Sequence, residues 1–389
     1  MPKNADFLPE SAELAIGFLL LPDFAMMSYA CASEPLRAAN RLSGRTLYRW
    51  RHFSVDGGPV MASSGVPIVP DGRIGDDVRL DALFVFAGGN PSTIEHGPTE
   101  AWLRTLARRG VRLGGISGGP FLLARAGLLA GRRATIHWEH LPAFAESFPD
   151  VGTTGTVYEI DGDRMTSAGG VAALDMMIEL IARDHGAALA AAVGDWFLRS
   201  ELRAGGTPQR TGTAERLGIA DPRLLRVLSH MEANPTEAPS RLRLARIAGL
   251  SVRRLEDLFA AHLGSTIGRH ALALKLDRAR RLLTQSGLSV IEVATACGFQ
   301  SASHFSRSYR TRFGIPPSAD QAGRAGLPRD GPGRERPGRE GSGREGPGRE
   351  GSGRESPGRD GSGQDGSGRD AAGRAAVRSQ SNRTSPPSR

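Results

Sequence analysis

The sequence predicts an α/β sandwich, followed by an all-α domain with two helix-turn-helix units and a disordered tail. Short apolar runs alternate with helical patterns in the first half of the chain, a basic helical stretch follows, and the C-terminal segment has almost no large apolar side chains. The 389 residues leave room for two or three domains. We expect the domains at 10–202 and 222–320, a linker at 203–221 and the tail at 321–389.

The first domain begins with strand-like segments. Buried strands are expected at residues 14–21 (LAIGFLLL), 83–87 (LFVFA) and 111–116 (VRLGGI). Their nearly continuous apolar character suits a parallel sheet that is covered on both faces. Helical patterns alternate with them at residues 26–41, 99–109, 120–129 and 171–184. Alternation of this kind predicts the α/β sandwich.

Several classes of protein are excluded by what the sequence lacks. No apolar run approaches the roughly 20 residues that span a bilayer, and the N-terminus lacks the layout of a secretory signal. Cys31 and Cys297 are too few and too far apart for a disulfide framework or a zinc site made of cysteines. We therefore expect a cytoplasmic protein with no membrane contact, no cofactor and no metal.

The positive charge is concentrated in the helical domain. Residues 1–221 hold 21 Lys and Arg against 25 Asp and Glu, whereas residues 222–318 hold 15 against 6. The helical domain thus carries a net charge of +9, equal to that of the whole chain. A compact basic domain of this kind indicates a polyanionic partner.

The helical domain contains one helix-turn-helix pattern near its start. Leu244, Ala245 and Ala248 share a helical face, Gly249 can adopt the positive φ of a tight turn, and Ser251 can cap the next helix. The face of that second helix that packs inward is expected to hold Leu255, Leu258, Phe259 and His262.

The same pattern recurs about fifty residues further on, over residues 290–313. Cys297 is expected to pack in the core, Gly298 to form the turn and Ser301 to cap the following helix. Phe305, Tyr309 and Phe313 are expected to form the buried stripe of that helix. A helix at 268–286 joins the two units. Two such units predict binding to two segments of the DNA major groove, about one helical turn apart.

Residues 291–317, IEVATACGFQSASHFSRSYRTRFGIPP, resemble the signature of the AraC/XylS family of transcription regulators. The resemblance implies binding to double-stranded promoter or operator DNA and an RNA polymerase contact. It places base-reading residues at Arg253, Glu256 and Asp257 in the first unit and at Ala302, Ser303, Ser306 and Arg307 in the second. The acidic residues of the first unit can accept from cytosine or face solvent. The expected DNA-binding residues are Arg253, Arg254, Glu256, Asp257, Ser301, Ala302, Ser303, Ser306, Arg307 and Arg310.

The first domain contains a possible nucleophile elbow. Ser117 follows a strand and precedes a helix, where free backbone N–H groups would suit a carboxylate. His137 lies after the next strand-like run, and a third member could come from Asp175, Asp184 or Glu139. The alternative is a serine that holds a ligand and a histidine that packs.

The segments GFLLLPDF (17–24), DALFVFAGGN (81–90) and SAGGVAALDMM (167–177) resemble the PfpI-type, class I glutamine-amidotransferase-like superfamily. The chain looks closest to its GlxA-type regulators, and the resemblance implies a flavodoxin-like sensor. Enzymes of this superfamily use a cysteine at the elbow and an acidic residue after the first strand. Here Ser117 stands at the elbow, and residues 24–28 (FAMMS) hold no carboxylate.

We therefore expect a catalytically inactive sensor in which Ser117 and His137 are vestiges. The alternative is a hydrolase or amidase that uses Ser117 as its nucleophile. The resemblance implies a small nitrogenous effector, a homodimer and an activator. Trp138 could face a cationic head group or lie in the core. Because ligands bind at the carboxyl ends of parallel strands, the expected ligand-binding residues are Asp23, Gly88, Gly89, Asn90, Ser117, Gly118, His137 and Trp138.

The tail is of low complexity. Residues 332–371 form eight pentads such as PGREG and SGRDA. Their side chains offer nothing that could offset the entropy lost on ordering, so we expect this segment to be disordered.

Overall fold

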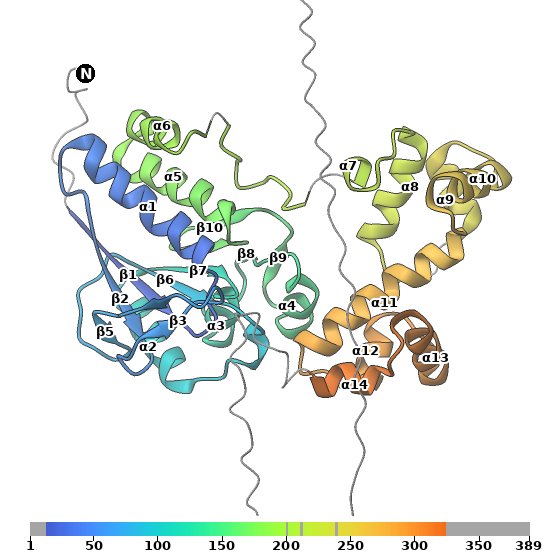
Figure 1. The fold of residues 1–389 in the computed structure, drawn as a ribbon, viewed down its shortest axis with the longest axis horizontal. Helices are drawn as coiled ribbons and strands as arrows, with labels where there is room; N and C mark the ends of the chain where they lie inside the picture. The colour runs from blue at the N-terminus through green and yellow to red at the C-terminus, as the bar shows by residue number, and fades with distance from the viewer. Residues whose placement is uncertain (1–12, 200, 211–212, 238–239, 324–389) are drawn as a thin grey trace, which may run out of the picture. The chain divides into compact units, whose positions relative to one another are not determined.

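The computed structural model describes residues 13–199, 201–210, 213–237 and 240–323 (Figure 1). All of them belong to one compact unit of the chain, residues 1–333. Most of the predicted tail lies outside the described residues. No helix in the described ranges has both the length and the apolarity that a membrane crossing requires.

The first domain is built on a seven-stranded sheet with the order β10-β11-β7-β6-β1-β2-β5. All neighbouring strands are parallel except β10 and β11. The strands are β1 (Leu14–Leu20), β2 (Tyr48–Ser54), β5 (Gly72–Arg73), β6 (Ala82–Ala87), β7 (Arg112–Ser117), β10 (Tyr158–Asp161) and β11 (Arg164–Ser167). The three predicted strands are β1, β6 and β7, and every residue of β6 is buried.

Helices cover both faces of this sheet, as the apolar strands require (Figure 1). One face packs against α1 (Met26–Ser43) and α5 (Val171–His185), with α6 (Ala187–Trp196) beside them. The other face packs against α2 (Gly97–Arg108) and α3 (Pro120–Arg125). Helix α3 is shorter than expected because Gly127, at φ 74°, turns the chain soon after it. The α/β sandwich is thereby confirmed.

Short elements complete the first domain. They are β3 (Val60–Met61), β4 (Pro67–Ile68), the 3-10 turn η1 (Pro91–Thr93), β8 (Arg133–Thr135), α4 (Leu141–Ser147) and β9 (Gly152–Thr154).

The segment expected as a linker is in part bonded to the first domain. The N–H of Val157 donates to the carbonyl of Thr207 at 2.8 Å. The side-chain amide of Gln209 donates to the carbonyls of Ile136 and Thr156. Helix α7 (Thr213–Leu217) follows. The start of this segment therefore belongs structurally to the sandwich, while the proposed domain boundaries stay a prediction.

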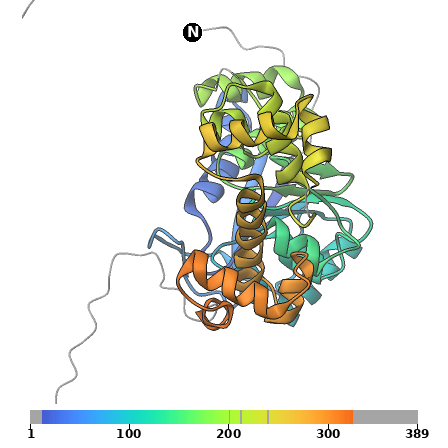
Figure 2. The same ribbon diagram turned by 90° about the vertical axis from the view of Figure 1, so that its right-hand side faces the viewer.

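In the residues that the structure describes, all regular elements of the second domain are helices, as expected. Its helices are α8 (Pro222–Ala233), α9 (Arg241–Ala248), α10 (Val252–Leu263), α11 (Ile267–Gln285), α12 (Val290–Ala296), α13 (Ala302–Phe313) and α14 (Pro317–Gly323). The two helix-turn-helix units pack on different halves of α11 (Figure 2). Ile267 and Ala271 lie in one core cluster with Phe259 of the first unit. Leu276 and Leu283 lie in another core cluster, which holds Phe305 and Tyr309 of the second unit and also residues of the first domain.

Candidate nucleic-acid interface and candidate effector site

The first helix-turn-helix unit has the geometry that the sequence predicts. Gly249 adopts φ 68° between α9 and α10, and the hydroxyl of Ser251 accepts from the N–H of Arg254 at 3.3 Å. Leu244, Leu255 and Phe259 are buried at the contact of the two helices with the core. His262 is exposed, so it does not share the buried face of α10.

The outer face of α10 is polar and exposed. Arg253, Arg254 and Asp257 are exposed. Glu256 lies 3.1 Å from Arg241 of α9 in an ion pair. The carboxylate of Glu256 thus has a partner inside its own unit, which makes the two arginines the better candidates for contacts to a polyanion.

The second unit repeats this geometry. Gly298 adopts φ 71°, and Ser301 caps α13 by accepting from the N–H of His304 at 3.4 Å. Phe305 and Tyr309 are fully buried. Cys297 is also fully buried, which confirms its core position. The hydroxyl of Tyr309 donates to Asp320 and so ties α13 to α14.

Helix α13 exposes a row of polar side chains. Ser301, Ser303, Arg307 and Arg310 are exposed, and Ser306 is half-buried. Ala302 at the helix start is exposed as well. Within the described part of the chain, neither Arg307 nor Arg310 forms an ion pair, whereas Arg312 on the same helix bonds Asp277 of α11. The predicted DNA-binding residues of this unit therefore share one accessible face.

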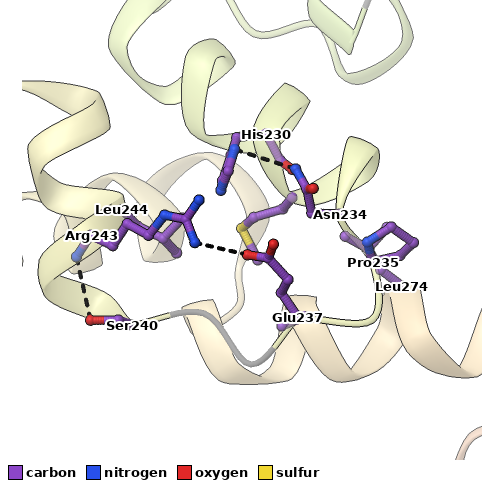
Figure 3. Close-up of a pocket in the computed structure, with 10 residues that line it drawn as sticks. His230, Asn234, Pro235, Glu237, Ser240, Arg243, Leu244 and Leu274 are labelled. Carbon is purple, nitrogen blue, oxygen red and sulfur yellow. Dashed lines mark hydrogen bonds and ion pairs between the residues drawn. The ribbon is translucent and has the colours of Figure 1, made fainter. Parts of the chain in front are cut away.

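A pocket of the helical domain that sequence reasoning did not anticipate lies between α8, α9 and α11 (Figure 3). Its polar groups bond one another: the guanidinium of Arg243 lies 3.1 Å from the carboxylate of Glu237, and the side-chain amide of Asn234 donates to the main-chain carbonyl of His230 at 2.8 Å. We interpret it as part of the packing of the first unit.

The elbow in the first domain is present. Ser117 ends β7 with φ 60°, a conformation that is uncommon for a serine and typical of strained turns at functional sites. The expected free N–H groups after it are not there. The N–H of Gly118 donates to Ala87, and the N–H of Gly119 donates to Ile116. The expectation of free N–H groups after Ser117 was wrong, because the tight turn uses them itself.

A second hydroxyl faces the elbow. A Cβ added to Gly169 would lie 2.7 Å from Oγ of Ser28 and 2.9 Å from Cβ of Ser117, so both serines border this glycine. Ser28 is buried, and its Oγ accepts from the N–H of Gly170 at 2.7 Å. The side chain of α1 that lies beside the elbow is therefore the hydroxyl of Ser28, and a hydroxyl cannot act as a general base that activates Ser117.

No described hydrogen bond joins Ser117 to His137. Two of the three candidates for a third member serve other partners. Asp175 is buried against Arg199 at 2.6 Å and Arg203 at 2.8 Å, and Asp184 pairs with Arg112. Glu139 alone approaches His137, at 3.9 Å. The structure therefore does not assemble a triad at the elbow in the described residues.

The carboxyl ends of β1, β6 and β7 do bring predicted residues together. Asp23 adopts φ 62°, and its carbonyl fills the space where a Cβ of Gly88 would lie. Gly89 lies against the side chain of Asp23, and Gly118 packs on Pro91. Asn90 is different, because its oxygen caps η1 and its amide donates to the carbonyl of Thr284 in α11 at 2.7 Å.

His137 and Trp138 lie on the turn between β8 and α4. Burial lowers the pKa of His137. Trp138 is 37 % exposed, so it is not a core residue. The guanidinium of Arg210 lies 4.7 Å from its ring centroid, and a cation of the chain itself therefore covers the ring. His140 follows on the same turn, and burial lowers its pKa to about 4.

Sequence reasoning missed the partners of this turn. His140 is buried, and its Nδ1 lies 3.0 Å from Oε1 of Gln285 at the end of α11. Arg278 of α11 also contacts Glu146 of α4, at 3.3 Å. The sequence did hold one signal for this contact: Gln285 is a polar residue on the face of α11 that is otherwise apolar and buried.

Comparison with known proteins agrees with both domains. The model of the DJ-1/PfpI family matches residues 25–183, and that of a helix-turn-helix domain matches residues 244–322. The chain is 47 % identical to the HTH-type transcriptional regulator CdhR of Pseudomonas aeruginosa over 78 % of this chain and 90 % of that protein. It is 44 % identical to the regulator GbdR of the same species, over 80 % and 84 % of the two chains. It is 43 % identical to the regulator GlxA of Rhizobium meliloti, over 78 % and 94 %. The chain therefore belongs to the AraC-type helix-turn-helix transcriptional regulators that carry a DJ-1/PfpI domain, and it is a DNA-binding regulator of transcription.

Proposed function

We propose that this regulator binds an operator of two sequence blocks and that a small nitrogenous effector in the first domain controls that binding. The observation that carries the proposal is the pair of helices with exposed arginines, α10 and α13, whose units pack on the same helix α11. A helix with exposed arginines and short polar side chains can read base edges in a major groove.

The two units are proposed to differ in how they read DNA. In α13, Arg307 and Arg310 with the serines at the helix start offer both base and phosphate contacts. In α10, Arg253 and Arg254 take this role, and Glu256 serves to position Arg241 instead. We therefore expect the block read by α13 to be the more specific of the two.

The effector is proposed to bind at the carboxyl ends of β1, β6 and β7. Asp23, Gly88, Gly89, Ser117 and Gly118 meet there. The carboxylate of Asp23 suits the amino or ammonium group of a nitrogenous metabolite.

Catalysis at the elbow of Ser117 is not part of the proposed function. The hydroxyl of Ser28 beside Ser117 cannot take up its proton as a base would. Replacing Ser117→Ala should leave DNA binding in the absence of effector unchanged and shift only the effector response. An ester- or amide-hydrolysing activity of the purified chain that Ser117→Ala abolishes would instead establish the hydrolase alternative.

Three further parts of the function are proposed from the family. The chain acts as a homodimer, contacts RNA polymerase and activates transcription, as expected for a cytoplasmic regulator. Sedimentation of the full-length chain with and without operator DNA tests the first part, and transcription from a reconstituted promoter tests the other two.

The experiment that tests the function as a whole is selection of binding sites from a random DNA pool by the full-length chain. We expect an enriched motif with two blocks about one helical turn apart. Enrichment of a single block would contradict the use of both units. No enrichment, with or without an extract of small metabolites, would contradict the proposed control of DNA binding.

A further inference from the structure

The turn between β8 and α4 brings together three side chains of the types that bind metal ions in proteins. One donor atom from each of His137, Glu139 and His140 lies within 4.8 Å of the other two. In the described part of the chain this is the single group of three histidine, cysteine or acidic residues so arranged. We propose that these three residues bind a divalent transition-metal ion, and that Zn²⁺ fits them best.

The backbone brings the two histidines to the same side of the turn. The N–H of His140 donates to the carbonyl of His137 at 2.9 Å, which closes the turn between them. Their ring centroids lie 6.0 Å apart. Nδ1 of His137 lies 3.9 Å from Oε2 of Glu139. The grouping is therefore set by a local hydrogen bond and by residues spaced two and three apart.

The donor set is that of a zinc site with an open position. Two imidazoles and a carboxylate bind Zn²⁺ at about 2.0–2.2 Å in four-coordinate geometry, with water in the fourth position. Donor atoms around such an ion lie roughly 3.3 Å apart. Side-chain rotation can close the remaining distance, because Glu139 is exposed and His137 is only partly buried.

Gln285 supports the proposal from outside the turn. His140 is 7 % exposed, and its Nδ1 lies 3.0 Å from Oε1 of Gln285. With this amide oxygen as acceptor, Nδ1 carries the hydrogen, and Nε2 is left with the lone pair that a metal needs. Histidine ligands of metals commonly donate their other N–H to an oxygen in this way. The bond thus favours the tautomer of His140 whose Nε2 can bind an ion.

Zinc binding by the full-length chain tests the proposal. The purification tag is removed, metals are stripped with a chelator, and Zn²⁺ affinity is measured by competition with a chromophoric chelator. The variants are His137→Ala and Glu139→Gln, and the control is His262→Ala, which removes an exposed histidine of α10. We expect one Zn²⁺ per chain in the wild type and the control, and at least tenfold weaker binding in both variants. Equal affinity in all four proteins would overturn the proposal.

Gln285 and the ligand types allow two sharper tests. Gln285→Leu should weaken Zn²⁺ binding by about 10–100-fold. Gln285→Glu keeps a hydrogen-bond acceptor for His140, so this variant should retain most of the wild-type Zn²⁺ affinity. Equal affinity of Gln285→Leu and the wild type would show that His140 is not held as a ligand. With Co²⁺ in place of Zn²⁺, we expect the strong visible absorption of a four-coordinate site with nitrogen and oxygen ligands. A thiolate charge-transfer band would assign the ion to a cysteine and overturn the proposal.

Discussion

Arg307 is the side chain of α13 whose loss should change sequence recognition most directly. It is exposed on the polar face of the helix, and no ion pair holds it within the described part of the chain. A good bidentate contact from arginine to a guanine contributes about 1–3 kcal/mol of discrimination. Arg307→Ala should therefore weaken binding to the preferred operator by about 5- to 150-fold.

Arg312 provides the matched control. It lies on the same helix and carries the same charge, but its guanidinium bonds both carboxylate oxygens of Asp277 at 2.8 Å. Arg312→Ala removes one positive charge and an ion pair within the domain. We expect it to lower stability slightly and to leave base preference unchanged.

The assay is fluorescence anisotropy with the selected operator and with variants changed at one base pair each. Arg307→Ala should bind the preferred site more weakly and lose its preference at one position. If Arg307 contacts a phosphate instead, affinity should fall evenly for all sites and the salt slope should drop by about 1. Wild-type base preferences in Arg307→Ala would refute its role in base reading.

Three other predictions concern stability, reactivity and the tail. Asp175→Asn should lower the free energy of unfolding by about 2 kcal/mol, because it removes a buried charge that pairs with the partly exposed Arg199 and Arg203. A loss below about 0.5 kcal/mol in urea unfolding would contradict this. Burial raises the pKa of Cys297 to about 11, so at pH 8 an alkylating reagent should leave this thiol unmodified in the native chain and react with it only after unfolding. Removing residues 325–389 should keep operator affinity within a few-fold, and a loss beyond about tenfold would show that the tail contributes.

The strands and helices with continuous apolar patterns were predictable from the sequence. The expected strands at 83–87 and 111–116 agree with β6 and β7 to within one residue. Strand β2 escaped notice because YRWRHFS exposes polar side chains along a strand near the edge of the sheet. The pair β10 and β11 was missed as well, since four-residue strands carry too little pattern.

In the candidate sites too, features set by neighbouring residues were predictable, whereas contacts between residues far apart in the sequence were not. The elbow at Ser117 and the caps at Ser251 and Ser301 depend on neighbours within a few residues, so local sequence predicts them. The bond from His140 to Gln285 joins residues 145 positions apart. Only folding brings such partners together, and no short sequence pattern predicts their contact.

The shared helix α11 has a consequence for the architecture of target promoters. It is one continuous helix of 19 residues, about 28 Å long, with a helix-turn-helix unit fastened to each half. The length of α11 therefore fixes the spacing between the two units, and the spacing of the two DNA blocks must match it. Adding one base pair between the two blocks turns the second by roughly 35° about the duplex axis, and adding about five carries it to the opposite side. We expect natural operators to tolerate base changes within a block far better than any change in the distance between blocks.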